Sequence, residues 1–384
     1  MQQATRLLTT FSLSLLAAIS YASDPGVTDV SITLGMSAPL TGLHGSYGID
    51  MQRTIEAYFA NINKNGGIHG RKLGLVALDD GYETDRTVAN ANTLIKEKKV
   101  FALLSFYGSS PTIEAMNKVV GPARVPLVGT ISGAASLREP ISTNPNLRYM
   151  FNVRSSYAEE TALLVKHLTT LGTSRIAVFY QNDGFGKSGL EGVTAALNQH
   201  KLTPVAVGSV ERNSLDVTKA VADIVKSNPQ AIIMVTLSKP TSVFIKAVRQ
   251  AQLSPNFLVL SPVGTQQLIQ ELGDTDARGI AVSQVVPHPW TASTPVVREY
   301  QKFCTSPCTY SYYGMEGFLM ARTMVEGLSR MNSKDMTRER LVTALESLSE
   351  VDYGGFKIGY TPTSRRGSSF TELTVVGQGG KILK

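Results

Sequence analysis

The side chains that usually carry out catalysis are present in this chain, but their spacing does not assemble a catalytic centre. None of the five histidines lies in H-E-x-x-H or in another metal-ligand spacing; they are His44, His69, His167, His200 and His288. No G-x-S-x-G turn presents a nucleophilic serine. We find no set of nucleophile, base and orienting group, so the sequence predicts neither an enzyme nor a metal site.

Two short patterns imitate functional motifs. Residues 186–188 read Gly-Lys-Ser, like the end of a phosphate-binding loop, but Gln181 stands where that loop needs a glycine. Asp79 and Asp80 form a paired carboxylate at the end of a predicted strand, and we interpret them as a turn that caps the next helix. Neither half of the chain has G-x-G-x-x-G after its first strand, so no cofactor is predicted.

Three loops rich in hydroxyl groups and glycine offer binding chemistry instead, at residues 42–48, 107–112 and 129–133. Each follows a predicted strand, and in open α/β sheets ligands bind beyond the carboxyl ends of the strands. In the second loop Ser110 suits the N-cap of a helix and Pro111 suits its first position. The free N–H groups of such a helix attract a carboxylate without any lysine or arginine.

Three hydroxyl side chains near this helix, Ser109, Thr130 and Ser132, can donate further hydrogen bonds to the same carboxylate. Their spacing equally allows them to be only capping and turn residues. The residues by themselves therefore leave a carboxylate site and a set of ordinary turns as open alternatives.

An alternation of strands and helices must position these loops. Apolar runs predict strands at residues 32–36, 73–78, 101–104, 125–128, 176–180, 205–207, 231–235 and 257–260. Helical spacing of apolar residues separates them, as in residues 51–62, and that helix should end at 65–67, which read Asn-Gly-Gly. Such alternation gives parallel sheets covered by helices. The predicted fold class is α/β, with two doubly wound parallel-sheet lobes in 384 residues.

Residues 1–22 have the pattern of a secretory signal peptide. An apolar run follows Arg6, and small residues precede the expected cut after Ala22. The run is shorter than the roughly 20 residues that span a bilayer, and no cysteine near the cut could carry a lipid. We expect a secreted mature chain that is soluble in the periplasm.

Cys304 and Cys308 are the two cysteines of the chain. In an exported protein such a close pair predicts a disulfide. A two-ligand metal site is the alternative, but no partnering histidine or cysteine lies nearby in the sequence.

The formal net charge is +7, and the lysines and arginines are scattered singly among acids. A nucleic-acid surface normally has its basic residues clustered on one face. No nucleic-acid partner is therefore predicted, and the charge is interpreted as a solvated basic surface.

Motifs in order along nearly the whole mature chain resemble one known family. They lie at residues 36–42, 61–73, 79–80, 109–110, 175–178 and 183–186, and read MSAPLTG, NINKNGGIHGRKL, DD, SS, RIAV and DGFG. Together they are similar to the branched-chain-amino-acid (leucine/isoleucine/valine) type of periplasmic substrate-binding proteins of ABC transporters.

This resemblance implies a type I periplasmic binding fold, in which a hinge of three strands joins the two lobes. With crossings near Asn152, Val285 and Tyr353, the first lobe would comprise residues 23–152 plus 286–352, and the second residues 153–285 plus 353–384. It also implies a monomer that closes over a small polar ligand, an amino acid or a related carboxylate or amide. An inner-membrane ABC permease would then receive the ligand.

Site residues follow from the resemblance by position. The carboxylate would be bound by Ser109, Thr130 and Ser132, with Ser110 beside them. The aromatic walls of the site would be Tyr47, Phe185 and Tyr313, with Tyr157 and Glu316 nearby. At the position of Ser261, family members that bind amino acids have an acidic residue, and that residue pairs with the ligand's ammonium group. An aromatic position of the family is Leu237 here. The ligand is therefore an amino acid held differently, or a carboxylate or amide without that amine.

Three functions remain as alternatives at this point. The first is a transport binding protein, the second is a free periplasmic sensor that presents its ligand to a membrane receptor, and the third is an enzyme such as a hydrolase. We expect no transmembrane or signalling segment, and this favours a free binding protein over a fused receptor.

Overall fold

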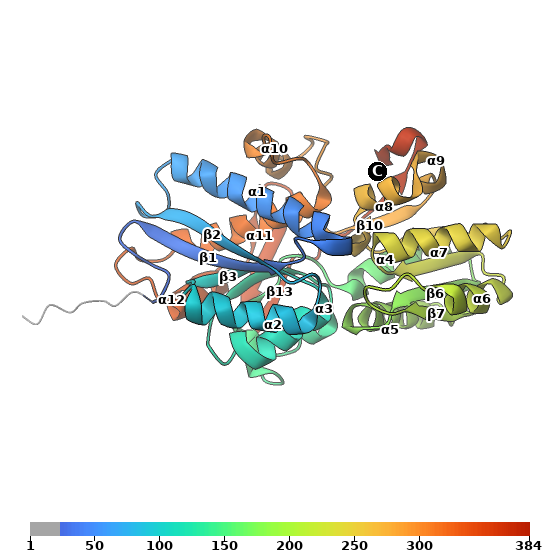
Figure 1. Ribbon diagram of the computed structural model, residues 1–384, viewed down its shortest axis with the longest axis horizontal. Helices are drawn as coiled ribbons and strands as arrows, with labels where there is room; N and C mark the ends of the chain where they lie inside the picture. Colours follow the sequence, from blue (N-terminus) through green and yellow to red (C-terminus); the bar gives the residue numbers. More distant parts are fainter. Residues whose placement is uncertain (1–23) are drawn as a thin grey trace, which may run out of the picture.

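The computed structural model describes residues 24–384, which form two α/β lobes lying side by side (Figure 1). The α/β fold class with two sheet-based lobes is therefore confirmed. The predicted signal peptide, residues 1–22, lies outside the described residues. Among residues 24–384, no helix is both long enough and apolar enough to cross a membrane.

The first lobe is built on a five-stranded parallel sheet in the order β2-β1-β3-β4-β5. Its strands are β1 (Ser31–Ala38), β2 (Lys72–Asp79), β3 (Ala102–Tyr107), β4 (Leu127–Ile131) and β5 (Met150–Phe151). Its helices are α1 (Gly45–Lys64), α2 (Thr84–Asn92), α3 (Ser109–Ala115), α10 (Pro295–Phe303), α11 (Tyr312–Ser329) and α12 (Arg338–Glu346). A small antiparallel sheet consists of β11 (Val351–Asp352), β12 (Lys357–Thr361) and β13 (Ser364–Gly367).

The second lobe is built on a seven-stranded sheet in the order β15-β14-β10-β9-β8-β6-β7. Its strands are β6 (Ile176–Gln181), β7 (Val207–Val210), β8 (Ala231–Val235), β9 (Asn256–Val259), β10 (Ala281–Gln284), β14 (Glu372–Val376) and β15 (Ile382–Leu383). Its helices are α4 (Tyr157–Thr170), α5 (Gly184–Gln199), α6 (Thr218–Lys226), α7 (Ser238–Gln250), α8 (Thr265–Leu272) and α9 (Asp274–Ala277). The strands β14 and β15 pair antiparallel at one edge of this otherwise parallel sheet.

Apolar runs locate most of the strands because a parallel sheet covered on both faces buries its strands along their length. Every residue of β3, β4 and β8 is buried. Each predicted strand has its counterpart, although β7 begins at Val207, two residues later than expected. The predicted end of the first helix is also confirmed, since α1 ends at Lys64. The strands that were not predicted are β5, β10, β11, β12, β13, β14 and β15.

Both sheets reverse their strand order at one point, between β1 and β3 in the first lobe and between β6 and β8 in the second. At such a switch point the connections leave on opposite faces of the sheet, so a crevice forms beyond the strand ends. The chain that follows β3 meets the chain that follows β6, because the Ser110 hydroxyl accepts a hydrogen bond from the Gly184 N–H at 2.9 Å. The two crevices therefore face each other across one boundary, which we call the seam.

The third crossing between the lobes was expected near Tyr353. Strands β12 and β13 still pack on the first lobe: the Tyr360 ring lies edge-on to Phe151 with 5.2 Å between centroids, and the Asn152 N–H donates to the Arg365 carbonyl at 3.0 Å. We therefore propose a third crossing after Gly367 in place of the one near Tyr353. The divisions at Asn152 and Val285 stay predictions.

The predicted disulfide between Cys304 and Cys308 is present, with 5.1 Å between the Cα atoms. It closes the turn between α10 and α11 in the first lobe, and the Cys308 sulfur lies 3.4 Å from the Thr54 hydroxyl of α1. The alternative, a two-ligand metal site, is wrong, since both sulfurs are used in the bond. Among the described residues no cluster of three or more potential ligands could hold a metal.

Replacing both cysteines, Cys304→Ala with Cys308→Ala, should lower the free energy of unfolding by about 2 kcal/mol. The loss is at the low end of the range for disulfides because the bond closes a short loop, with a sequence separation of only 4. Urea unfolding of the oxidised wild type and the double variant would measure it. Equal midpoints, or two free thiols in native protein labelled without reductant, would contradict the role of the bond.

Candidate functional site

The three hydroxyl groups predicted to hold a carboxylate are all buried, and two of them lie together in the seam. Ser109 begins α3, and its Oγ lies 2.7 Å from Oγ of Ser132, which follows β4. The hydroxyl of Tyr157, the first residue of α4 in the second lobe, lies 3.4 Å from the same Ser109 oxygen. Thr130 instead bonds to α3, with its Oγ1 2.8 Å from that of Thr112. Ser109, Ser132 and Tyr157 thus form one group of hydroxyls contributed by both lobes.

Ser110 does not cap α3 as predicted. The helix begins at Ser109 and its N-cap is Gly108, whose φ of +88° is accessible mainly to glycine, so no side chain caps the helix. The Ser110 hydroxyl makes the contact with Gly184 across the seam instead. A Cβ atom at Gly184 would lie 2.8 Å from that oxygen, so the absence of a side chain there permits the close approach of the lobes.

Three tyrosines of the first lobe form an aromatic cluster, and the hydroxyls of two of them reach the second lobe. Tyr47 of α1 stacks on Tyr313 of α11 with 4.6 Å between ring centroids, and Tyr107 of β3 lies 6.0 Å from Tyr47. The Tyr47 hydroxyl lies 2.7 Å from Oγ of Ser238, and the Tyr313 hydroxyl donates to the carbonyl of Pro262 at 2.7 Å. The predicted aromatic positions Tyr47 and Tyr313 therefore lie at the seam and also connect the lobes.

The predicted positions of the second lobe lie in the same region. Phe185 is in the first turn of α5, with its ring centroid 5.1 Å from that of Tyr157. The Asp183 carboxylate caps this helix by accepting from the Phe185 N–H at 2.9 Å. Leu237 is the N-cap residue of α7 and is buried. Both α5 and α7 follow the strands that flank the switch point of the second sheet.

A buried arginine and two glutamates meet beside Ser261. Nη2 of Arg154 lies 2.9 Å from Oε1 of Glu160 and also donates to the Ser261 hydroxyl, while Nη1 lies 3.4 Å from Oε2 of Glu316. Oε2 of Glu160 accepts from the Ser261 N–H at 2.9 Å and from the Ser283 hydroxyl at 2.6 Å. The three charged side chains are at most 4% exposed. The Glu160 carboxylate is thus well bonded, whereas Oε2 of Glu316 has no hydrogen bond within the described chain.

Burial raises the pKa of the Glu316 carboxyl from 4.5 to about 7, with Arg154 opposing and Glu160 adding to the shift. Burial acts to lower the pKa of Arg154, but the carboxylates of Glu316 and Glu160 raise it above its ordinary value. The guanidinium therefore stays charged, and Glu316 is the member of the group whose charge depends on its surroundings. A cation placed beside Glu316 would favour its ionised form.

Several residues of the seam were not predicted, among them Tyr82, Arg154, Glu160 and Gln181. The Gln181 side-chain amide donates to the Tyr82 hydroxyl at 2.9 Å, which adds another contact between the lobes. Glu160 carries the one usable signal, because it lies four residues before Leu164 on the buried face of α4. An acid in an apolar helical stripe needs a buried partner. Tyr82 and Gln181 have no comparable signal in the sequence.

His44 lies at the edge of the aromatic cluster and is 3% exposed. Its ring stacks on Tyr47 with 5.7 Å between centroids and lies edge-on to Tyr82 at 5.5 Å. Its Nδ1 atom has no hydrogen-bond partner among the described residues. Burial, together with the positive charge of Lys239 from the second lobe, lowers the pKa of His44 from 6.5 to about 4. The arrangement of the seam therefore requires a neutral imidazole.

Comparison with known proteins gives a consistent result. A family model for periplasmic binding proteins matches residues 31–381. A possible leucine/isoleucine/valine-binding protein from Rhodopirellula baltica SH 1 is 32% identical, with a TM-score of 0.86 over 92% of this chain and 96% of that one. A substrate-binding periplasmic protein from Ralstonia solanacearum is also 32% identical, with a TM-score of 0.85 over 92% of this chain and 99% of that one.

Among curated proteins, an amino acid binding protein from Pseudomonas aeruginosa is 26% identical over 243 residues. The match covers 63% of this chain and 63% of that protein, so the chain spans less than two thirds of this relative's length. The two solved structures, in contrast, match most of both chains, so the similarity in fold includes both lobes.

His44→Gln and Glu316→Gln should change the pH dependence of stability in opposite directions. The pKa of His44 is lowered to about 4 from 6.5, so the unfolded chain binds more protons in that window and stability rises with pH there. The pKa of Glu316 is raised to about 7 from 4.5, so its contribution to stability falls as pH rises through that window. His44→Gln should therefore reduce the gain in stability with pH, and Glu316→Gln should enlarge it.

Thermal unfolding at several pH values between the lowered pKa of His44, about 4, and the raised pKa of Glu316, about 7, would measure both slopes. The pKa of Asp80 is also raised, to about 6, chiefly by burial, but this group is common to all three proteins and cancels in the comparison. If the slope of stability against pH in both variants matches the wild type, or changes in the same direction, the pKa values of His44 and Glu316 are not shifted in opposite directions.

Proposed function

This chain belongs to the periplasmic binding proteins of the leucine/isoleucine/valine type, and from that premise we propose that it captures a small amino acid in the seam between its lobes. It is a binding protein and not an enzyme. The observation that carries the proposal is the meeting, at one seam, of hydroxyl groups suited to a carboxylate and an acid suited to an ammonium group. The relatives' names, amino acid binding and possible leucine/isoleucine/valine binding, support the same ligand class.

The carboxylate of the ligand would bind the hydroxyls of Ser109 and Ser132. These two oxygens lie 2.7 Å apart and bond to each other, so a ligand carboxylate between them would accept a hydrogen bond from each. The Tyr157 hydroxyl, 3.4 Å from Ser109, would be a third donor contributed by the opposite lobe. A site of neutral donors suits a carboxylate because each hydrogen bond to an ionised group is stronger than one to a neutral group.

The ammonium group would pair with Glu316 in place of the acid that relatives carry at the position of Ser261. Glu160 accepts directly from the Ser261 N–H, and Glu316 reaches this position through Arg154, which donates to the Ser261 hydroxyl. One carboxylate balances the guanidinium, and Glu160 is the one with good hydrogen bonds. Oε2 of Glu316 lies 3.4 Å from Nη1 of Arg154 but makes no hydrogen bond, so an ammonium group there would supply the missing donor and balance the second carboxylate.

We further propose that the mature chain works in the periplasm and hands its ligand to an ABC permease in the inner membrane, as the family resemblance implies. The contacts across the seam support a cycle of opening and closure about the three crossings. Opening must break the bonds of Tyr47, Tyr313 and Ser110 to the second lobe. A ligand that bonds both lobes adds contacts that exist only in the closed arrangement, so its binding favours closure.

Ser109→Ala should weaken amino-acid binding by roughly tenfold to a hundredfold, because a hydrogen bond to a charged group contributes about 1.5–3 kcal/mol. Calorimetric titration with leucine, isoleucine and valine, and with the deaminated acid of each, would measure it. The free energy of unfolding should change little, since water would solvate the hydroxyls of Ser132 and Tyr157 when the lobes open. Ser174→Ala, at an exposed position just before β6, is the matched control and should bind as the wild type does. If Ser109→Ala binds the amino acid with unchanged affinity, the ligand's carboxylate is not bound by Ser109 and the proposed carboxylate site is wrong.

Tyr47→Phe should reduce the closed fraction, because it removes the hydroxyl bond to Ser238 across the seam while keeping the stacked ring. Small-angle scattering of the wild type should show a smaller radius of gyration when the ligand is saturating, and the variant should need more ligand to reach it. Tyr58→Phe is the control, since Tyr58 packs on Phe303 and Phe318 inside the first lobe. A radius that does not change at saturation would argue against hinge closure.

A further inference from the structure

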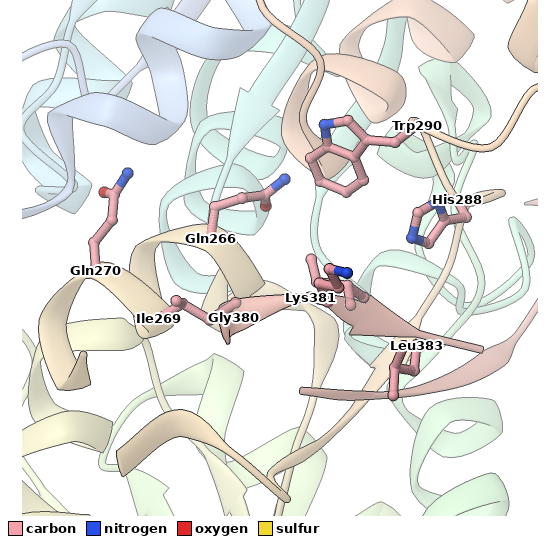
Figure 2. A pocket seen from close by; sticks show the side chains of 9 residues that line it. Gln266, Ile269, Gln270, His288, Trp290, Gly380, Lys381 and Leu383 are labelled. Atoms are coloured by element: carbon pink, nitrogen blue, oxygen red, sulfur yellow. The ribbon is translucent and has the colours of Figure 1, made fainter. Parts of the chain in front are cut away.

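A depression lies away from the hydroxyl and tyrosine groups of the seam. It has a volume of about 460 Å³, and its walls are α8, the segment at His288 and Trp290, and residues 380–383 at the end of the chain (Figure 2). We call it the hinge groove. Ligand pockets are commonly about 300–1,000 Å³, so a small organic molecule fits this volume. Nothing in the proposed function uses the groove.

The hinge groove has walls from both lobes. Trp290 is held by the first lobe: its ring lies edge-on to Tyr312 of α11 with 5.6 Å between centroids, and the Pro289 carbonyl accepts from the Gln301 side chain of α10 at 2.9 Å. The opposite walls belong to the second lobe, because β15 pairs with β14 and β14 with β10. Any rotation of one lobe on the other therefore changes the distance between Trp290 and α8.

Charge and apolar surface in the groove specify one kind of occupant. Lys381 is the charged side chain of the lining, which contains no carboxylate, and no ion pair of the described chain includes Lys381. Asp274 lies behind Gly380 and outside the lining. The apolar part comes from Ile269, Trp290 and Leu383, of which the last two are 38% and 52% exposed. The groove therefore combines a positive charge with a flat apolar wall.

Gln266 adds a directional feature. Its side-chain nitrogen is buried and has no hydrogen-bond partner among the described residues. In Figure 2 the Gln266 side chain extends from α8 toward the side on which Trp290 lies. A buried donor without an acceptor costs free energy, which an acceptor on a bound molecule would recover. Lys381 and Gln266 are both donors, so the molecule should carry an acceptor that is also an anion.

We infer that the hinge groove is a second binding site for a small aromatic or branched apolar carboxylate, whose acid group bonds Lys381 and Gln266 while its apolar body lies on Trp290. Because the walls of the groove come from both lobes, a ligand that contacts both walls stabilises the arrangement of the lobes seen in this structure. Binding there is thermodynamically coupled to opening and closure, and the coupling is reciprocal.

The test uses Trp290 as its own reporter, since the chain has a single tryptophan. Phenylacetate should change the Trp290 emission saturably at millimolar concentration and raise the melting temperature, because it binds the folded protein. The probe 2-phenylethylamine has the same ring but a positive charge, and it should do neither. Lys381→Gln should weaken phenylacetate binding about tenfold, the effect of one charged hydrogen bond.

Two control variants separate the groove from the seam. Lys226→Gln, at the exposed end of α6, keeps the change in net charge and should bind phenylacetate as the wild type does. Ser109→Ala, which alters the seam, should also leave the Trp290 response unchanged. The inference is overturned if the response does not saturate, if the amine gives the same response, or if Ser109→Ala abolishes it while Lys381→Gln does not. None of these readouts requires that the chain bind an amino acid, so the proposed function stands or falls separately.

Discussion

The rest of the seam depends on one buried charge, the guanidinium of Arg154. The residue lies where the chain leaves β5 for α4, and its side chain is 1% exposed. A buried charge is strongly destabilising unless partners compensate for its lost hydration. Glu160 from the second lobe, Glu316 from the first lobe and the Ser261 hydroxyl are those partners. Compensation of this one charge therefore fixes α4, α11 and the end of β9 against one another at the boundary of the lobes.

A second constraint acts on the neutral groups around that charge. The tyrosine hydroxyls and serine hydroxyls of the seam are buried, and each bonds to a group that comes from elsewhere in the chain. Such bonds contribute about 0.5–1.5 kcal/mol each, because water would satisfy the same groups in an open seam. Individually weak contacts of this kind suit a boundary that opens and closes. The hinge groove, with Trp290 on one lobe and α8 on the other, lies at the same boundary and experiences the same motion.

The sequence allowed the sheets and part of the site to be predicted, for reasons visible in particular residues. Apolar runs such as 231–235 are buried on both faces of a sheet, so hydrophobicity alone locates them. Ser109 and Ser132 lie next to strand ends, and every strand end of a parallel sheet reaches the same edge. Ser110 was misjudged because the positive φ of Gly108 starts α3 at Ser109, and the serine then faces Gly184 instead of its own helix. Strands β12 and β13 were not predicted, because strands this short carry no sign in the sequence of which lobe they pack on.

By itself the sequence determined the fold class, the disulfide and the presence of hydroxyl-rich loops, since these depend on patterns within a few neighbouring residues. Tertiary structure alone decided which side chains compensate Arg154, because Glu160 and Glu316 come from helices that are far apart in the chain and meet only when the lobes pack. It also decided that the Ser261 hydroxyl accepts a hydrogen bond from the buried Arg154, and that the chain's single tryptophan faces a helix of the other lobe. Long-range pairing of buried polar groups depends on the positions of whole elements, and no local pattern in this sequence specifies those positions.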